Sequence, residues 1–130
     1  MCHRHYQLPS NDDLVYPGIS IPSLSASEWE TLVIESRVPS MVMFTELKRC
    51  ITVGPYCRGL VTTMEKLSKD DFNGQFKFYT VDTDEEPGIA HFYHVDTAVT
   101  TITVFKAGDL MTAYTGHDPW MLLKLALEYI

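Results

Sequence analysis

The sequence predicts an α/β fold, a three-layer α/β/α sandwich with a mixed central sheet. Strand and helix patterns alternate along the chain in the order β-α-β-α-β-α-β-β-α, and a short turn joins the last two strands. A βαβ unit pairs strands in parallel and a hairpin pairs them antiparallel, so both pairings should occur in one sheet. The 130 residues, 45% of them apolar and 21% charged, suffice for one compact core.

The predicted domain spans residues 18–130, behind a mobile tail of residues 1–17 that has no apolar period. GISIPSLS is a short extended segment in which Pro22 removes a ladder donor, so this strand should lie at a sheet edge. Ser25 and Glu28 form a capping box that opens an amphipathic helix. The apolar run SMVMF is typical of a strand buried on both faces.

The rest of the chain supplies three strands and three helices. A helix with an apolar face follows the cysteine region, and the strand FKFYTVDT comes next. Pro87 lies in the first turn of a short helix, and KAGD joins the strands TITVF and LMTAYTG as a hairpin. We expect FKFYTV, SMVMF and TITVF to be central in the sheet. The final helix is capped by Asp118, and its predicted apolar stripe comprises Trp120, Leu123, Leu127 and Ile130.

Charge and cysteine content exclude several classes of protein. A net charge of −7 indicates an acidic, soluble protein without a basic surface for nucleic acid. No apolar run approaches the length of a membrane span, so we expect no membrane insertion. Three cysteines are too few for a disulfide scaffold and suit a reducing compartment. The first residues make a poor transit peptide, so we expect the cytoplasm, or a plastid if a targeting segment was removed.

The segment CITVGPYC holds the two cysteines that bear on function, Cys50 and Cys57. A dithiol catalyst needs an exposed thiolate at a helix N-terminus and a second thiol close behind it. Six residues separate the two cysteines, enough to turn and bring their Cα atoms within disulfide range. The alternative is that Cys57 is a small buried residue and Cys50 a loop residue.

Several motifs in the same order resemble the thioredoxin family over roughly residues 19–130. VDTDEEPGIAHFY is similar to a Val-Asp-x-Asp-Glu-x-Pro motif of that family. VFKAGD resembles its Phe-Lys-x-Gly hairpin, and TGHDPWMLLKLALEYI resembles its glycine and final helix. The motifs are most similar to those of the m-type members. This resemblance implies a thioredoxin-like fold.

The resemblance is weakest at the family's redox motif, Trp-Cys-Gly-Pro-Cys. Spacing within the second helix implies that Cys57 is the second, resolving cysteine. Gly54 then occupies the position of the nucleophile and Val53 that of the tryptophan. Phe44 stands ten residues before Gly54, where the family has five, which implies about five inserted residues.

Two further positions differ from the family pattern. Thr100 replaces the family's cis-proline, and Met43 replaces the buried aspartate beneath the dithiol. A cis bond before a residue other than proline costs about 2.5–4 kcal/mol, so we expect a trans bond at Thr100. Together the departures predict a degenerate active site.

Two functional hypotheses follow, and under the first the protein is not primarily an enzyme. It is a redox-inactive or weakly active domain that binds another protein as an adaptor, assembly factor or chaperone, without a cofactor. Its contact site would be an enlarged loop, residues 45–56, together with the loop before TITVF. The predicted binding residues are Leu47, Lys48, Arg49, Ile51, Val53, Gly54, Pro55, Tyr56, Thr100 and Thr101.

The alternative is an atypical thiol-disulfide oxidoreductase that uses Cys50 and Cys57, or Cys57 alone. We expect Cys57 to be buried in the first turn of the second helix, with its sulfur apart from Cys50 in reduced protein. We predict no metal site, because the possible ligands Cys2, His3 and His5 lie in the tail. The pair His91 and His94 likewise lacks a third ligand.

Overall fold

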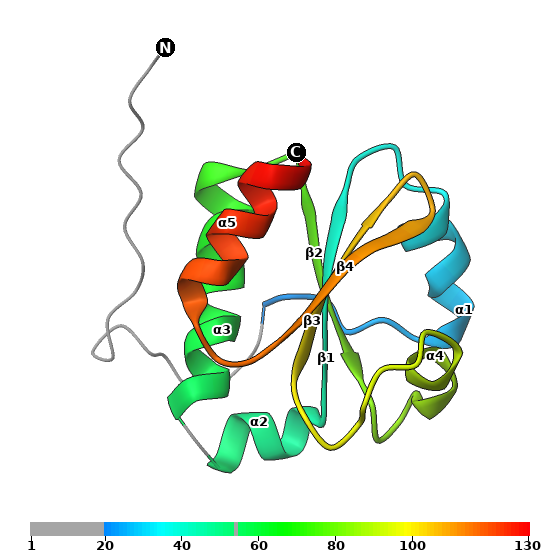
Figure 1. Ribbon diagram of the computed structural model, residues 1–130, viewed down its shortest axis with the longest axis vertical. Helices are drawn as coiled ribbons and strands as arrows, with labels where there is room; N and C mark the ends of the chain where they lie inside the picture. The colour runs from blue at the N-terminus through cyan, green and yellow to red at the C-terminus, as the bar shows by residue number, and fades with distance from the viewer. Residues whose placement is uncertain (1–19, 54) are drawn as a thin grey trace.

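The computed structural model describes residues 20–53 and 55–130, and within them a four-stranded mixed sheet forms the centre of the fold (Figure 1). The strand order is β2-β1-β3-β4. β1 pairs in parallel with β2 and antiparallel with β3, and β3 and β4 form the antiparallel hairpin. The mixed sheet and the hairpin are therefore confirmed. The strands are β1 (Ser40–Thr45), β2 (Lys77–Asp82), β3 (Thr101–Lys106) and β4 (Asp109–Thr115).

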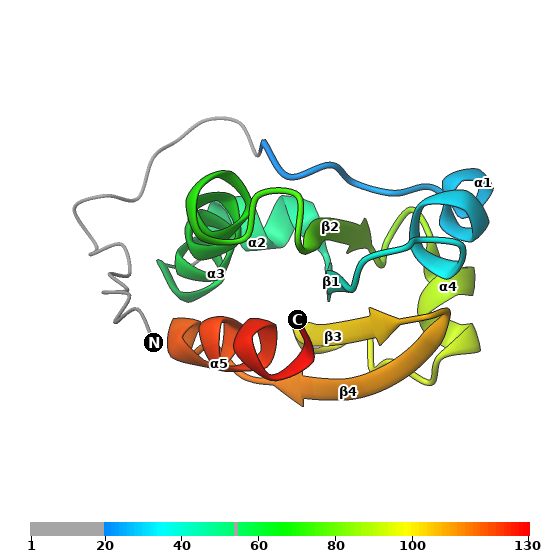
Figure 2. The ribbon, with the colours of Figure 1, turned by 90° about the horizontal axis from the view of Figure 1, so that it is seen from above.

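Helices cover both faces of this sheet, which confirms the three-layer sandwich (Figure 2). One face carries α3 (Pro55–Lys66), its π-helical continuation η3 (Leu67–Asp71), and α5 (Pro119–Tyr129). The opposite face carries α1 (Ala26–Trp29), its continuation η2 (Glu30–Ile34), and α4 (Pro87–Phe92). A further helix, α2 (Leu47–Val53), follows β1 at one end of the sheet (Figure 1).

The central strand β1 is buried along its whole length, as its apolar run predicted. Because side chains alternate across a strand, Met41 and Met43 pack toward α3 and α5, in the same core cluster as Leu60 and Leu122. Val42 and Phe44 point to the other face, where Trp29 is among the residues that cover them. Each such fully buried apolar side chain stabilises the fold by about 1.5–3 kcal/mol.

The first predicted strand is reduced to a single bridge. Ser23 pairs in parallel with Thr80 of β2, and two backbone hydrogen bonds flank this bridge. The Leu24 N–H donates to the Thr80 carbonyl at 2.8 Å, and the Thr80 N–H donates to the Pro22 carbonyl at 2.9 Å. Pro22 has no N–H with which to extend the ladder. β2 therefore lies at the edge of the sheet, and its predicted central position is wrong.

The final helix begins where it was predicted, but of its predicted apolar stripe only Leu123 is buried. Its cap is confirmed, because the Trp120 N–H donates to the Asp118 carboxylate at 3.0 Å. Trp120, Leu127 and Ile130, which were expected to face the core, are about half exposed. The helix is apolar on several sides, so its periodicity alone could not select the covered side. The buried residues are Leu122, Leu123, Leu125 and Ala126.

The predicted tail of residues 1–17 and its boundary with the domain lie outside the described residues. None of the helices that the structure describes combines the length and the apolar character needed to cross a membrane.

Candidate functional site

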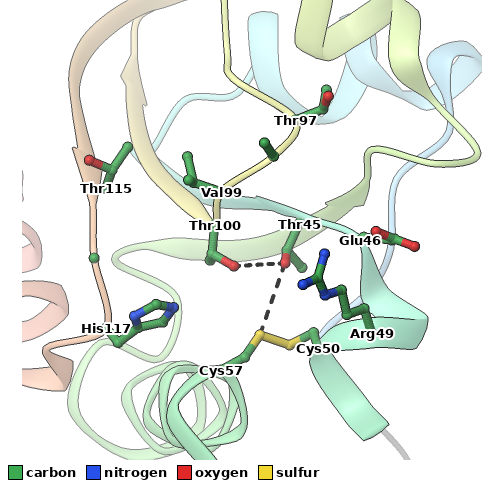
Figure 3. Close-up of a pocket in the computed structure, with 12 residues that line it drawn as sticks. Thr45, Glu46, Arg49, Cys50, Cys57, Thr97, Val99, Thr100, Thr115 and His117 are labelled. Carbon is green, nitrogen blue, oxygen red and sulfur yellow. Dashed lines mark hydrogen bonds between the residues drawn. A yellow bond between two sulfur atoms is a disulfide. The ribbon is translucent and has the colours of Figure 1, made fainter. Parts of the chain in front are cut away.

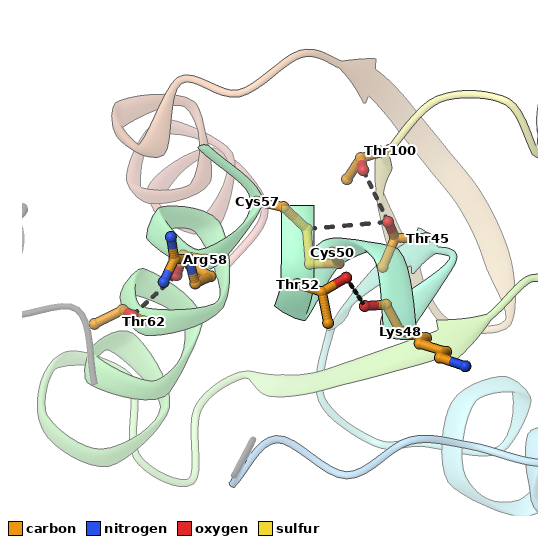
Figure 4. Close-up of a disulfide and its surroundings, with 8 residues drawn as sticks. All are labelled: Thr45, Lys48, Cys50, Thr52, Cys57, Arg58, Thr62 and Thr100. Carbon is orange, nitrogen blue, oxygen red and sulfur yellow. Dashed lines mark hydrogen bonds between the residues drawn. A yellow bond between two sulfur atoms is a disulfide. The ribbon is translucent and has the colours of Figure 1, made fainter. Parts of the chain in front are cut away.

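Cys50 and Cys57 form a disulfide between α2 and α3 (Figure 4). Their Cα atoms are 5.3 Å apart, inside the usual range for this bond. Cys57 lies in the first turn of α3 and only 8% of its surface is exposed, which confirms its predicted position. The expectation of two separate sulfurs was made for reduced protein, which this oxidised structure does not test. The alternative in which Cys50 is an unpaired loop residue is wrong.

The inserted residues form a helix where an enlarged loop was predicted. After β1 ends, the Cys50 N–H donates to the Glu46 carbonyl at 2.9 Å, and the Thr52 hydroxyl donates to the Lys48 carbonyl at 2.8 Å. Cys50 is buried on the inner side of α2, 5% exposed. The β-branched residues of CITV have modest helix propensity, so the local sequence did not indicate this helix. The disulfide supplies a tertiary restraint that holds it.

The predicted contact residues of this segment are only partly described. Lys48 and Arg49 are exposed, and Leu47 is half-buried. The side chains of Ile51, Val53, Pro55 and Tyr56, and the whole of Gly54, lie outside the described part of the chain.

An open pocket of about 480 Å³ lies above the disulfide (Figure 3). Three segments that are distant in sequence enclose it: the end of β1 with α2, the loop before β3, and the turn between β4 and α5. The disulfide lies at its floor. The lining residues are Thr45, Glu46, Arg49, Cys50, Cys57, Thr97, Ala98, Val99, Thr100, Thr115, Gly116 and His117.

Two threonine hydroxyls connect the disulfide to the loop before β3. The Thr45 and Thr100 hydroxyl oxygens are 2.8 Å apart, and the Thr45 oxygen is 4.0 Å from the Cys57 sulfur. Thr100 therefore lies at the pocket, whereas Thr101 is buried and does not line it. The Thr101 hydroxyl has no hydrogen-bond partner within the described residues. The trans bond expected at Thr100 stays a prediction.

Sequence reasoning named the loop before β3 as part of the contact site, but it did not single out Thr97 or Val99 there, and it missed Thr115 and His117 at the turn after β4. None of these residues belongs to a motif with chemistry of its own. The one available signal was the glycine of TGHD, because glycine is the residue that most readily adopts a positive φ in a turn. Gly116 adopts a φ of 152°, and a Cβ there would lie 2.4 Å from the Tyr114 hydroxyl, close enough to clash.

Buried apolar side chains pack against the disulfide on the side away from the pocket. Cys50 and Cys57 belong to the same core cluster as Met43 and Leu60, and both of these neighbours are fully buried. Burial disfavours a charged thiolate, whereas the N-terminus of α3 favours it at Cys57. No group of three or more potential metal ligands occurs among residues 20–53 and 55–130.

Comparison with known proteins gives consistent matches. The thioredoxin family model matches residues 20–128. The chain is 37% identical over 116 residues to thioredoxin M4, chloroplastic, of Arabidopsis thaliana, covering 89% of this chain and 56% of that protein. It is 31% identical over 108 residues to the chloroplastic M-type thioredoxin of Spinacia oleracea, covering 83% and 56%. The chain thus spans little more than half the length of these plastid relatives.

Two other matches cover nearly the whole of the compared protein. A thioredoxin of Synechocystis is 27% identical over 107 residues, covering 82% of this chain and 94% of that protein. The solved structure of Malassezia sympodialis thioredoxin superposes with a TM-score of 0.69 at 22% identity and covers 98% of both chains. The interpretation of a degenerate site receives no support, because the two cysteines are joined at the floor of a pocket. The chain belongs to the thioredoxin family.

Proposed function

We propose that this protein exchanges thiols and disulfides with other proteins through Cys50 and Cys57. The observation that carries this proposal is the disulfide at the floor of an open pocket. A purely structural disulfide is more useful to a chain that lacks a core, and this chain has one on each face of its sheet. Membership of the thioredoxin family supports the same function.

The reaction needs both sulfurs in their reduced form. One cysteine thiolate attacks a substrate disulfide, forms a mixed disulfide and releases the first substrate thiolate. The second cysteine attacks the protein sulfur of the mixed disulfide, closes Cys50–Cys57 and releases the second substrate thiolate. The substrate gains two electrons, and the two cysteine protons balance the two substrate thiolates. A dithiol reductant then restores the reduced pair.

The surroundings of the pocket favour a protein substrate. The basic residues Lys48 and Arg49 are exposed on α2, and Arg49 also lines the pocket. The net charge of the chain is −7, so these two residues form a local positive patch on an acidic protein, and such a patch orients partners with acidic surfaces. This basic pair would serve equally well in binding without chemistry. If the reductase assay below fails, the adaptor hypothesis takes the place of the oxidoreductase.

We further propose a plastid location and a domain of residues 18–130 behind the first seventeen residues. The location is supported by the chloroplastic relatives. A fluorescent fusion of the full-length gene product would check it.

The direct test is reduction of insulin disulfides by dithiothreitol, followed as turbidity. The protein should accelerate the reaction, and Cys50→Ser and Cys57→Ser should each abolish the acceleration. Thr52→Val is the matched control, because Thr52 is exposed on α2 and bonds only within that helix among the described residues. Absence of acceleration by folded wild-type protein would overturn the proposed function.

A further inference from the structure

We infer that the hydroxyls of Thr45 and Thr100 form a proton relay for Cys57. The relay carries the Cys57 proton to the substrate sulfur that leaves when the Cys50–Cys57 disulfide closes. This inference rests on the proposed function and keeps the order that the family's motif implies, in which the second cysteine, here Cys57, resolves the mixed disulfide. It assigns a chemical role to two residues that lie outside that motif.

The Cys57 thiol must give up its proton in order to resolve the mixed disulfide, because the thiolate is the nucleophile. Cys57 is only 8% exposed and belongs to the same core cluster as Met43, which is fully buried. Water therefore has little direct access to this proton. Burial also disfavours a free thiolate, so the proton has to be transferred as Cys57 attacks.

The buried side of the disulfide offers no group to take the proton. Met43 occupies the position at which the family has an aspartate beneath the dithiol. No carboxylate or imidazole is buried anywhere in residues 20–53 and 55–130. The buried polar residues are Ser40, Thr45, Thr63, Thr80, Thr83, Thr101 and Thr103. The proton must therefore leave on the side of the pocket.

Two hydroxyls in series lead from the Cys57 sulfur to the pocket (Figure 4). The Thr45 hydroxyl oxygen is 4.0 Å from that sulfur and 2.8 Å from the Thr100 hydroxyl oxygen. Thr45 is buried, whereas Thr100 is half-buried and lines the pocket. A hydroxyl both donates and accepts, so each threonine can release one proton while it receives another. Hydrogen bonds in such a chain also strengthen one another.

Three other ionisable side chains line the pocket besides the cysteines, namely Glu46, Arg49 and His117. All three are exposed to solvent. The guanidinium of Arg49 cannot accept a proton. Glu46 and His117 are the competing acceptors, and Figure 3 shows His117 on the Cys57 side of the pocket. Thr45 differs from both because it is buried beside the sulfur.

The closing step balances through this relay. In the mixed disulfide, Cys50 is bonded to a substrate sulfur. The Cys57 sulfur bonds to the Cys50 sulfur, and the bond from Cys50 to the substrate breaks with its electron pair on the substrate sulfur. The Cys57 proton passes to Thr45, a Thr45 proton to Thr100, and a Thr100 proton to the departing substrate thiolate. A neutral substrate thiol leaves, and each threonine ends with one hydroxyl proton, as it began.

A single-turnover experiment separates this closing step from the first attack. Reduced protein in a Cys2→Ser background is mixed with a peptide dimer joined by an intermolecular disulfide, and acid-quenched samples are followed by intact mass. The reaction is run at about pH 6, below the range in which an ordinary cysteine thiol ionises. In Thr45→Val the mixed disulfide should accumulate. Its closure should be slower by about 100-fold, the lower end of what a positioned proton transfer contributes.

Matched variants distinguish loss of the hydroxyl from loss of shape. Thr45→Ser keeps the hydroxyl and should restore closure. Thr100→Val should slow closure as well, and the double valine variant should be no slower than the slower single variant, because both hydroxyls serve one relay. Thr52→Val is the exposed control on α2 and should change nothing. Circular dichroism checks that every variant is folded.

The pH dependence of closure is a readout that a structural role would not produce. The relay moves a proton between two sulfurs without exchange with solvent, so closure in the parent protein should depend little on pH. In Thr45→Val the solvent must remove the Cys57 proton. Closure in that variant should therefore speed up about tenfold per pH unit below the range of thiol ionisation and approach the parent rate above it.

The first attack provides the internal reference. It is measured as adduct formation in a Cys57→Ser background, where closure cannot follow, and Thr45→Val should leave it unchanged. An equal slowing of the first attack would overturn the relay, because Thr45 would then act on substrate binding or on the fold of the site.

The remaining outcomes separate the relay from the proposed function. Closure in Thr45→Val within about tenfold of the parent rate overturns the relay, while reductase activity of the wild-type protein stands. His117→Gln and Glu46→Gln test the competing acceptors, and slow closure in either of them beside normal closure in Thr45→Val also overturns it. Folded wild-type protein that forms no adduct and reduces no insulin overturns the proposed function itself.

Discussion

Reduction of the Cys50–Cys57 disulfide should lower the stability of the domain by an amount that the chain itself sets. The two residues are seven apart in sequence, so the bond closes a ring of about eight residues. The chain-entropy relation for a ring of that size gives about 2.5 kcal/mol at 25 °C. For a domain of this length, with about 4 °C of melting temperature per kcal/mol, the midpoint should fall by about 10 °C.

The stability lost on reduction should be concentrated in α2. Among its described side chains Cys50 alone is buried, whereas Lys48, Arg49 and Thr52 are exposed. Seven-residue helices are marginal in water without a tertiary restraint. Amide hydrogen exchange should therefore accelerate across residues 47–53 on reduction, while β1 and β3 keep their protection.

Urea denaturation with and without dithiothreitol measures the effect. The control is the Cys50→Ser, Cys57→Ser double variant, which has no disulfide in this site and should be insensitive to the reductant. A loss smaller than about 1 kcal/mol would refute the reasoning, because the bond would then add little restraint to that already present in the unfolded chain.

Three further predictions concern the scaffold. Trp29→Ala should lower the free energy of unfolding by about 3–5 kcal/mol in urea denaturation, because Trp29 is buried against the sheet. Trp120→Ala should change it by less than about 0.5 kcal/mol, because Trp120 is 54% exposed. Equal costs for the two variants would contradict the assigned core. Asp118→Ala should cost about 0.5–2 kcal/mol through loss of the cap of α5, with Asp118→Asn as the conservative control that retains a capping oxygen. Backbone and hydroxyl hydrogen bonds from Ser25 lower the pKa of Glu28 below 4.5, so its contribution to stability is present above that pH and is lost as pH falls through the lowered value. In Glu28→Gln the free energy of unfolding should depend less on pH in this acidic range. An unchanged pH dependence would show that the Glu28 carboxylate contributes nothing through the capping box.

Much of the scaffold could be predicted because its signals are local. The apolar run of β1, the caps at Ser25 and Asp118, and the β3–β4 hairpin each depend on neighbours within a few residues. Such patterns act through backbone geometry and alternate burial, so they can be read in order along the chain. The first strand was the exception, since Pro22 limited its pairing to one bridge.

The site depended on contacts between distant segments. Whether Cys50 reaches Cys57 depends on α2, a helix that its β-branched residues do not indicate and in which Cys50 is the one buried side chain among those described. Thr100 was found through the family pattern, but its partner Thr45 became visible only when β1 and the loop before β3 met.

The sequence by itself determined the order of elements apart from α2 and the first strand, the buried central strand and the presence of two nearby thiols. Periodicity and capping are properties of a few consecutive residues, so they can be recognised without knowledge of the rest of the chain. The tertiary structure alone decided that the thiols are joined, that Cys57 lies beneath Thr45, and which stripe of α5 is covered. Those features depend on contacts between distant segments, such as the 2.8 Å that separates Thr45 from Thr100, 55 residues further along the chain.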